Sequence, residues 1–407
     1  MDDAAARALL IRLGTFLDQF VGCFSRRAQR TFASRYVQGL LNDSERKSMQ
    51  AMHGRLSDPG SYQALQHFIT HSTWDPRPVW RHLRAALPVR RGVLAIDDTS
   101  FPKQGKRSVG VARQYCGALG KIANCQSAVS TALIAKGCAW LTSLELFLPR
   151  VWLDDTSERE WVGIPHTAYY REKWRIALAH VRQVLAAGIT IDAIVADSAY
   201  GEVGRFRTEL ERLGLRYVLA VPYFLSARLT PGGPSLALAT IANGVPAAAW
   251  RRLRWGRDGH LAARFAAIRV RPLHSRGDRW LLCQESLADG ERKYYFSNFP
   301  ETTSLRRLAI TARSRWAIEQ QYRDLKTELG LDHFEGRSYP GWGHHAVLAA
   351  ITFTFVQLER LRDANTLPSF PEMRNLVREI MGMLYILERP GLLKMMVSFQ
   401  RNPPLRI

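Results

Sequence analysis

Two apolar runs, each ending in acidic residues, constrain the fold of this chain more than any other feature. The first spans 93–98 and ends in Asp97 and Asp98, and the second spans 191–197 and ends in Asp197. Continuous apolar runs of this length are typical of buried strands. The runs therefore predict two strands that each carry a carboxylate near the end.

A third acid, Glu319, lies in a segment with helical spacing. Residues three, four and seven apart lie on one side of a helix. This spacing groups four residues on one face: Arg315, Glu319, Tyr322 and Lys326. Three carboxylates are the smallest set that holds two divalent cations for phosphodiester chemistry, and Mg²⁺ prefers oxygen ligands. Taken alone, each acid is more often a turn, cap or ion-pair residue, but together they predict a metal site.

These motifs resemble the three acidic motifs of the DDE transposases of bacterial insertion sequences. The third motif, Arg315-x3-Glu319-x6-Lys326, is similar to the Tyr-x2-Arg-x3-Glu-x6-Lys signature of the IS-four-like group, although Ala312 replaces the tyrosine. The sequence around the motifs is similar to the IS-seven-hundred-one branch of this group. The first two motifs are Asp98-Thr99 and Ala196-Asp197, and the segments similar to that branch are 97–106, 109–115, 120–121, 124–126, 330–332 and 335–337.

The resemblance implies a transposase whose catalytic and metal-binding residues are Asp98, Asp197 and Glu319. These acids would hold two Mg²⁺ ions, for which Mn²⁺ can substitute. Water would nick the transposon end, and the freed 3′-hydroxyl would attack target DNA without a covalent protein intermediate. The Asp-Thr pattern of the family selects Asp98 as the first ligand. Strand alternation places Asp97 and Asp98 on opposite faces and does not choose between them.

The charge of the chain indicates a polyanionic partner. It carries 57 Lys and Arg against 36 Asp and Glu, a formal net charge of +21. Double-stranded DNA, as terminal inverted repeats and target, is the expected partner. An anionic membrane surface, or a genome that favours arginine, is the alternative source of the excess. The expected DNA-binding residues are Arg315, Lys326, Tyr322, Lys103, Lys106, Arg113, Lys121 and Arg337.

Two other classes of function remain open. One is a DNA-binding protein derived from a transposase that no longer cuts, and the other is a structure-selective nuclease of the same fold. A homodimer is the simplest device for bringing two transposon ends together. The odd number of five cysteines, without a Cys-x2-Cys spacing, favours neither a disulfide framework nor a zinc site. We therefore expect a cytoplasmic protein that is associated with the nucleoid when DNA is bound.

The order of elements predicts an α/β protein with a ribonuclease-H-like core. Residues 1–90 are expected to form a helical domain, which the family resemblance implies binds DNA ends, and 91–221 the first part of the core. A β-rich insertion is expected at 222–301, where Trp255 or Trp280 is a candidate for stacking on an unpaired base, with packing in a small sheet as the alternative. Residues 302–360 would supply the catalytic helix, at 304–329, and the helix after it. Residues 361–407 would form a C-terminal helical region and a basic tail.

Overall fold

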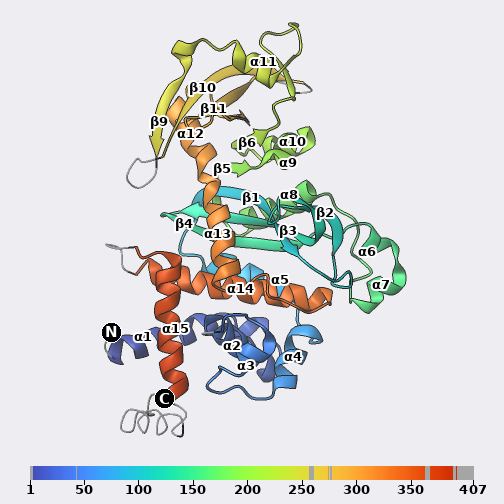
Figure 1. Cartoon of the computed structure of the whole chain (residues 1–407), viewed down its shortest axis with the longest axis vertical. Helices are drawn as coiled ribbons and strands as arrows, with labels where there is room; N and C mark the ends of the chain where they lie inside the picture. The colour runs from blue at the N-terminus through green and yellow to red at the C-terminus, as the bar shows by residue number, and fades with distance from the viewer. Residues whose placement is uncertain are drawn as a thin grey trace, which may run out of the picture.

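A computed structural model describes residues 3–42, 44–255, 261–273, 275, 277–362, 367–387 and 391. These residues form a long mixed sheet with helices packed on it and below it (Figure 1). The predicted α/β class is therefore confirmed. No helix in the described part of the chain is long and apolar enough to cross a membrane.

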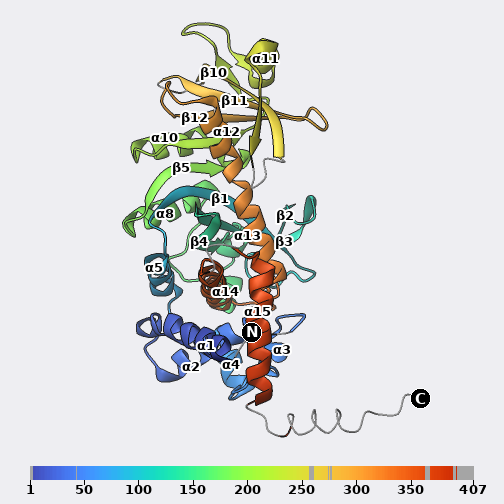
Figure 2. The ribbon, with the colours of Figure 1, turned by 90° about the vertical axis from the view of Figure 1, so that its left-hand side faces the viewer.

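The N-terminal region is helical, as predicted. Its elements are α1 (Asp3–Asp18), η1 (Val21–Cys23), α2 (Arg27–Leu41), α3 (Met49–His53), α4 (Tyr62–Thr70) and α5 (Pro76–Ala86). Ser48, Ser61 and Asp75 cap the last three helices by accepting bonds from backbone amides. The N-terminal helices share one hydrophobic core with α14 (Tyr339–Arg360) and α15 (Phe370–Leu387), and lie beside them in Figure 2.

Helix α14 is buried over most of its length, because its sequence is apolar on all sides. Two consecutive histidines of α14, His344 and His345, are buried and form hydrogen bonds with backbone carbonyls. The Leu331 carbonyl can only accept, so Nε2 of His345 donates to it at 3.1 Å and Nδ1 accepts from the Tyr36 hydroxyl at 2.8 Å. Burial lowers the pKa of His345 to about 4, so the folded protein holds this ring neutral.

His345 is therefore expected to make stability depend on pH. Its pKa is about 6.5 in an unfolded chain, so between pH 6.5 and 4 the unfolded state binds more protons than the folded one. The contribution of the neutral ring to the free energy of unfolding is complete above pH 6.5. It is lost as the pH falls toward 4, by about 3 kcal/mol in total. Urea unfolding of the wild type and of His345→Gln across this range measures it. The difference between the two proteins should shrink as the pH falls, and parallel curves would contradict the neutral, buried ring.

The central part of the sheet has the strand order β4-β3-β1-β5-β6. Its strands are β1 (Arg91–Pro102), β3 (Lys121–Ala135), β4 (Cys138–Leu146), β5 (Thr190–Ala196) and β6 (Tyr217–Val221), and a short strand that was not predicted, β2 (Ala112–Cys116), pairs with the start of β3. Strand β3 is antiparallel to both β1 and β4, whereas β1, β5 and β6 run parallel.

Helices cover both faces of this sheet. One face packs against α8 (Lys173–Ala186), α9 (Ser198–Gly201) and α10 (Gly204–Arg212), and Leu94 and Ile96 of β1 point to it. The other face packs against α12 (Leu305–Ser314) and α13 (Trp316–Thr327), and Ala95 points to it. Two short helices that were not predicted, α6 (Val151–Asp154) and α7 (Thr156–Trp161), follow β4. The alternation along β1 decides which side chain faces which helices.

The segment after β6 is β-rich, as predicted, and it extends the same sheet. Its elements are β7 (Ser226–Arg228), β8 (Leu236–Ala237), α11 (Leu238–Asn243), η2 (Ala247–Ala249), β9 (Arg251–Trp255), β10 (Leu261–Pro272), β11 (Arg279–Ser286) and β12 (Arg292–Ser297). Strand β12 pairs with β6, so the insertion continues the central sheet. Trp255 packs edge-on against Phe265, and the Trp280 indole donates to the Pro300 carbonyl.

The predicted helix at 304–329 is two consecutive helices, α12 and α13, which meet at Arg315 and follow one another in Figure 2. The Ser314 hydroxyl donates to the Thr311 carbonyl at 2.7 Å, a local bond of the kind that bends helices. The buried stripe was predicted correctly, since Ile318, Leu325 and Leu329 are all fully buried. Gly330 follows α13 with φ of 63°, a conformation that favours glycine.

Candidate active site

The acids of the two apolar runs meet where β1 and β5 lie side by side. These strands are parallel, and their register pairs Ile96 with Ala196. Asp97 is the next residue of β1 and Asp197 directly follows the last residue of β5, so the register makes them neighbours. Asp197 directly follows β5 and caps α9, with its Oδ1 accepting from the Ala199 amide at 3.1 Å and the Tyr200 amide at 3.3 Å.

Asp97 points to the sheet face that α12 and α13 cover. Its Oδ2 accepts from Nη1 of Arg315 at 2.6 Å, and its Oδ1 accepts from the Asp98 amide at 2.8 Å. The side chain is buried, and burial raises the pKa of Asp97 to about 7 against the opposing effect of Arg315. The pKa of Asp197 is also raised, mainly by burial and then by the charge of Asp98. Burial therefore disfavours the charged forms of both acids at this point of the sheet, and a cation bound there would offset this effect.

Glu319 joins these acids through Arg315. It lies in the first turn of α13, and its Oε1 accepts from Nη2 of Arg315. The same guanidinium group thus binds one carboxylate on β1 and one on α13. Sequence reasoning placed Arg315 beside Glu319 and assigned it to DNA phosphate. In the structure its donors bind the two acids, and a contact with DNA phosphate stays a prediction.

Asp98 points to the opposite face of the sheet. Its Oδ2 is 2.5 Å from Nζ of Lys173, at the start of α8, and its Oδ1 accepts from the Tyr200 hydroxyl. Lys173 also donates to the Ser127 hydroxyl at 2.9 Å. Sequence analysis did not identify Lys173 or Tyr200. Tyr200 follows Asp197 by three residues, which was a usable signal, whereas nothing local in the sequence relates Lys173 to Asp98.

The geometry favours Asp97 over Asp98 as the partner of Glu319. Asp97 shares Arg315 with Glu319, whereas Asp98 is held by Lys173 and Tyr200 on the other face. Both acids lie near enough to Asp197 for their charges to interact with it, so only the link to Glu319 separates them. The expected placement of the pair on opposite faces is observed. The prediction that Asp98 is a metal ligand rests on the family pattern alone.

The donor chemistry of these carboxylates fits a hard divalent cation. In the part of the chain that the structure describes, however, no three His, Cys, Asp or Glu side chains are close enough together to hold a metal ion. Cationic side chains bind these acids in the structure. Arg315 takes oxygens of Asp97 and Glu319, and Lys173 takes one of Asp98. A metal ion held by Asp97 and Glu319 would therefore share these carboxylates with Arg315.

Two of the predicted DNA-binding lysines donate hydrogen bonds to backbone carbonyls of the protein itself. Lys326 donates to the Ser100 carbonyl at 2.8 Å and lies over the Phe101 ring, which ties α13 to β1. Lys103 donates to the Phe334 carbonyl at 2.7 Å. Burial lowers the pKa of both side chains. Both donate to backbone carbonyls close to the strand that carries the acids.

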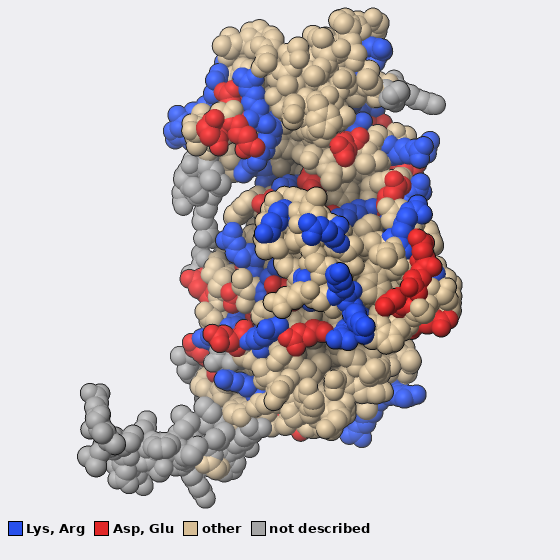
Figure 3. All heavy atoms as spheres, turned by 45° about the vertical axis from the view of Figure 1, so that its right-hand side comes forward, with Lys and Arg blue, Asp and Glu red and all other residues tan. Residues whose placement is uncertain are grey.

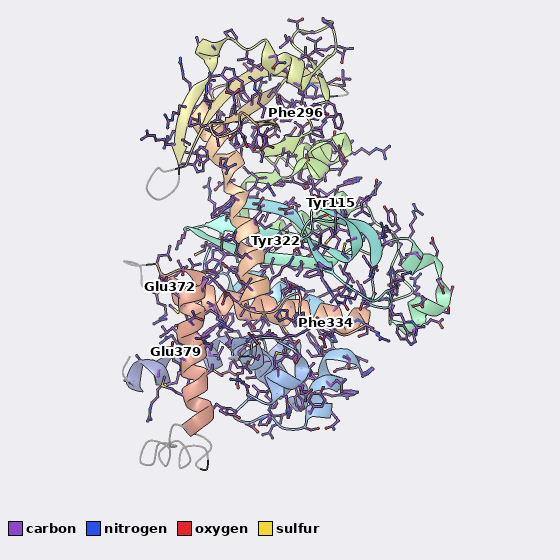
Figure 4. The ribbon with its side chains drawn as sticks, in the orientation of Figure 1. Tyr115, Phe296, Tyr322, Phe334, Glu372 and Glu379 are labelled. Carbon is purple, nitrogen blue, oxygen red and sulfur yellow. The ribbon has the colours of Figure 1, made fainter. Side chains whose placement is uncertain are left out.

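Tyr322 requires a correction, because its side chain points into the protein. It is buried between α13 and the sheet, with its hydroxyl 2.7 Å from that of Ser130, and Figure 4 labels it on α13 beside the strands. The sheet covers this side of α13, so Tyr322 does not lie on a surface that DNA can reach. Its neighbours Arg315 and Lys326 are only partly buried.

The remaining predicted DNA contacts are exposed: Lys106, Arg113, Lys121 and Arg337. Lys and Arg side chains form scattered groups over the face drawn in Figure 3. This distribution agrees with the spread of arginine along the sequence. Contact between these four residues and DNA stays a prediction.

Comparison with known proteins identifies the family. The profile described as DDE superfamily endonuclease matches residues 19–251, which is more than half of the chain, and the profile of the transposase DDE domain matches residues 168–355. The chain belongs to the DDE transposase family. The transposase is similar to the probable transposase for insertion sequence element IS701 of Microchaete diplosiphon. The two are 28% identical over 312 residues, which cover 74% of this chain and 76% of the relative.

These matches confirm the resemblance that the acidic motifs indicated. The transposase is thus an enzyme of the DDE endonuclease type. Both profiles include Asp197, the first alone includes the paired acids of β1, and the second alone includes Glu319. The family assignment is shown, and the role of each acid is a separate question.

Proposed function

We propose that this transposase cuts DNA at the ends of an insertion sequence and joins the freed ends to target DNA. The observation that carries the proposal is the meeting of acids from three elements. The register of β1 and β5 places Asp97 beside Asp197, and Arg315 connects Asp97 with Glu319 of α13. Acids so placed are the expected donors for metal-dependent phosphodiester chemistry.

A ribonuclease-H-like core supports this proposal. The strand order is β4-β3-β1-β5-β6, in which β3 is antiparallel to its two neighbours and β5 and β6 run parallel to β1. Helix α8 precedes β5 in the chain, and α10 precedes β6. This is the arrangement expected for that fold. The DDE match also implies it. On this basis the first acid lies on the first core strand, the second at the end of the fourth, and the third on a helix across one face.

We assign the ligand positions to Asp97, Asp197 and Glu319. Divalent ions such as Mg²⁺ or Mn²⁺, when bound by such acids, activate an attacking oxygen and stabilise a leaving one. Asp98 is assigned a supporting role. Its carboxylate neutralises Lys173 and accepts from Tyr200, and so fixes α8 and α9 against the strand that carries Asp97.

The side chains around the acids set the geometry of the site. Arg315 neutralises Asp97 and Glu319 together, so α13 keeps its acid turned toward the sheet. Lys326 fixes the other end of α13 through the Ser100 carbonyl. These two contacts hold Glu319 beside β1, and correct placement of reacting groups is a large part of enzymatic rate enhancement.

Double-stranded DNA is the proposed substrate, as transposon ends and as target. The net charge of +21 and the exposed cations Lys106, Arg113, Lys121 and Arg337 support this. A homodimer is proposed because two ends must be joined in one event. We place the protein in the cytoplasm, on the nucleoid when it is bound to DNA.

A strand-transfer assay tests the proposed function. The substrate is a duplex that carries the terminal sequence flanking the gene for this chain, together with a supercoiled target plasmid and Mg²⁺ or Mn²⁺. We expect cleavage at the end and covalent joining of its 3′-strand to the plasmid. Binding without cleavage would indicate a DNA-binding protein that has lost activity, and cleavage without joining would indicate a structure-selective nuclease.

A further inference from the structure

A basic hairpin arm next to the acids exposes large apolar side chains. The arm consists of residues 112–125, namely β2, the turn after it and the start of β3. Tyr115 pairs with Ile122 across the two strands, and Leu119 lies in the turn. Their exposed fractions are 64% for Tyr115, 61% for Ile122 and 48% for Leu119. Such a cluster at the surface of a protein often marks an interaction site.

The two faces of the arm differ. Tyr115 and Arg113 lie on one face, since they are two residues apart on a strand, and Ile122 is opposite Tyr115 on the same face. Cys116 and Cys125 lie on the other face and are buried. The arm therefore rests on the protein by one side and presents Tyr115, Ile122 and Arg113 on the other. Figure 4 labels Tyr115 on β2, at the edge of the sheet.

The turn of the arm is fixed to the strand that carries the acids. The Gly117 amide donates to the Ser100 hydroxyl at 3.1 Å, and the Ser100 carbonyl accepts from Lys326 of α13. Ser100 is three residues after Asp97 on β1. A duplex whose cleaved phosphate lies at the acids would therefore pass close to the arm.

The charge around the arm selects the partner. From Thr99 to Leu144 the chain has no Asp or Glu, while Lys103, Lys106, Arg107, Arg113 and Lys121 lie in its first half. A polyanion complements this field. A second copy of the chain would bring an equally basic arm against it, because both copies carry the same residues. DNA is thus favoured over a protein partner as the occupant of this apolar surface.

We propose that Tyr115, Ile122 and Leu119 form a wedge that opens or unstacks a base step of the transposon end beside the cleavage position. The inference rests on the proposed function, because it takes the transposon end as the ligand. Apolar side chains that enter between base steps partly unstack them, and aromatic rings bind unstacked bases without strong sequence preference. Arg113 and Lys121 would hold the neighbouring phosphates.

Fluorescence of 2-aminopurine tests the wedge. The base is placed at successive positions around the cleavage site of the terminal duplex, and Ca²⁺ replaces Mg²⁺ so that the DNA stays whole. We expect the wild type to raise the fluorescence severalfold at one or two positions. Tyr115→Ser combined with Ile122→Ser should return it to the level of free duplex and slow cleavage in Mg²⁺ by about tenfold. Binding to random duplex should change by less than about threefold, because phosphate contacts dominate it.

Matched variants separate the wedge from other effects. Leu229→Ser removes a side chain that is equally exposed, at 53%, in the insertion, and it should leave the fluorescence and cleavage unchanged. Arg113→Ala with Lys121→Ala should weaken binding and retain the fluorescence of each bound complex. Thermal unfolding shows whether each variant is folded.

Two results would overturn the wedge. One is a fluorescence rise that is absent in the wild type or unchanged in Tyr115→Ser with Ile122→Ser. The other is a wild-type dimer in sedimentation without DNA that this double variant converts to monomer, since the surface would then bind a second copy. Failure of the proposed function would give a different result, namely no cleavage in Mg²⁺, whether or not the fluorescence rises.

Discussion

Asp97→Asn is expected to lower the rate of cleavage at a transposon end by about a thousandfold or more, which corresponds to roughly 4 kcal/mol of transition-state stabilisation. The reason is that Asp97 shares Arg315 with Glu319 and neighbours Asp197 in the strand register. Asp197→Asn and Glu319→Gln should have similar effects. Single-turnover cleavage of a labelled terminal duplex measures the rate, and filter binding with the same duplex should show an affinity within a few-fold of the wild type.

Asp98→Asn is the informative comparison, because it changes the adjacent acid. The amide keeps an oxygen for Tyr200 and loses the ion pair with Lys173, so we expect a loss of only about tenfold. Asp192→Asn, on the same strand as the second acid but paired with Arg91, serves as the control for removal of a carboxylate. If Asp98→Asn abolishes cleavage and Asp97→Asn does not, the family pattern is right and the geometric assignment is wrong.

Arg315→Ala is expected to slow cleavage about a hundredfold at saturating DNA, because displacement of a reacting group by about 1 Å can cost that much. Without the guanidinium group, Glu319 loses its link to Asp97 and two carboxylates repel each other. Arg315→Lys should recover only part of the rate, since an ammonium group lacks the planar fork that spans two carboxylates. The rate at saturating DNA and the DNA concentration for half-maximal rate are measured separately.

The two measurements distinguish positioning from DNA contact. A positioning role predicts a lower maximal rate with a half-saturating concentration within about twofold of the wild type. A phosphate contact predicts the reverse, with the rate restored at high DNA concentration. Arg306→Ala is the control, because this exposed arginine of α12 removes one positive charge away from the acids.

Much of the fold followed from local pattern. The runs that end in Asp98 and Asp197 are strands, Ile318, Leu325 and Leu329 are buried, and the segment after β6 is β-rich. Each depends on a period of two or about four residues, which a sequence displays directly. The short strand β2 was missed because its five residues do not alternate clearly between apolar and polar.

The contacts of the site were less predictable. Arg315 reaches back to Asp97 across 218 residues, and Lys173 reaches Asp98 across 75. Helical spacing put Tyr322 on the face of Glu319 but could not show that the sheet covers it. A sequence shows which residues share a face of their own helix or strand, whereas the packing partner of that face depends on the tertiary structure.

Manganese binding tests the central claim most directly, that Asp97, Asp197 and Glu319 form one metal site. Electron paramagnetic resonance counts the Mn²⁺ bound to the protein with an uncleavable terminal duplex. The wild type and Asp98→Asn should each bind about two ions per active site, and Asp97→Asn and Glu319→Gln should bind fewer, with weaker affinity. Wild-type binding in Asp97→Asn, together with its loss in Asp98→Asn, would contradict the assignment.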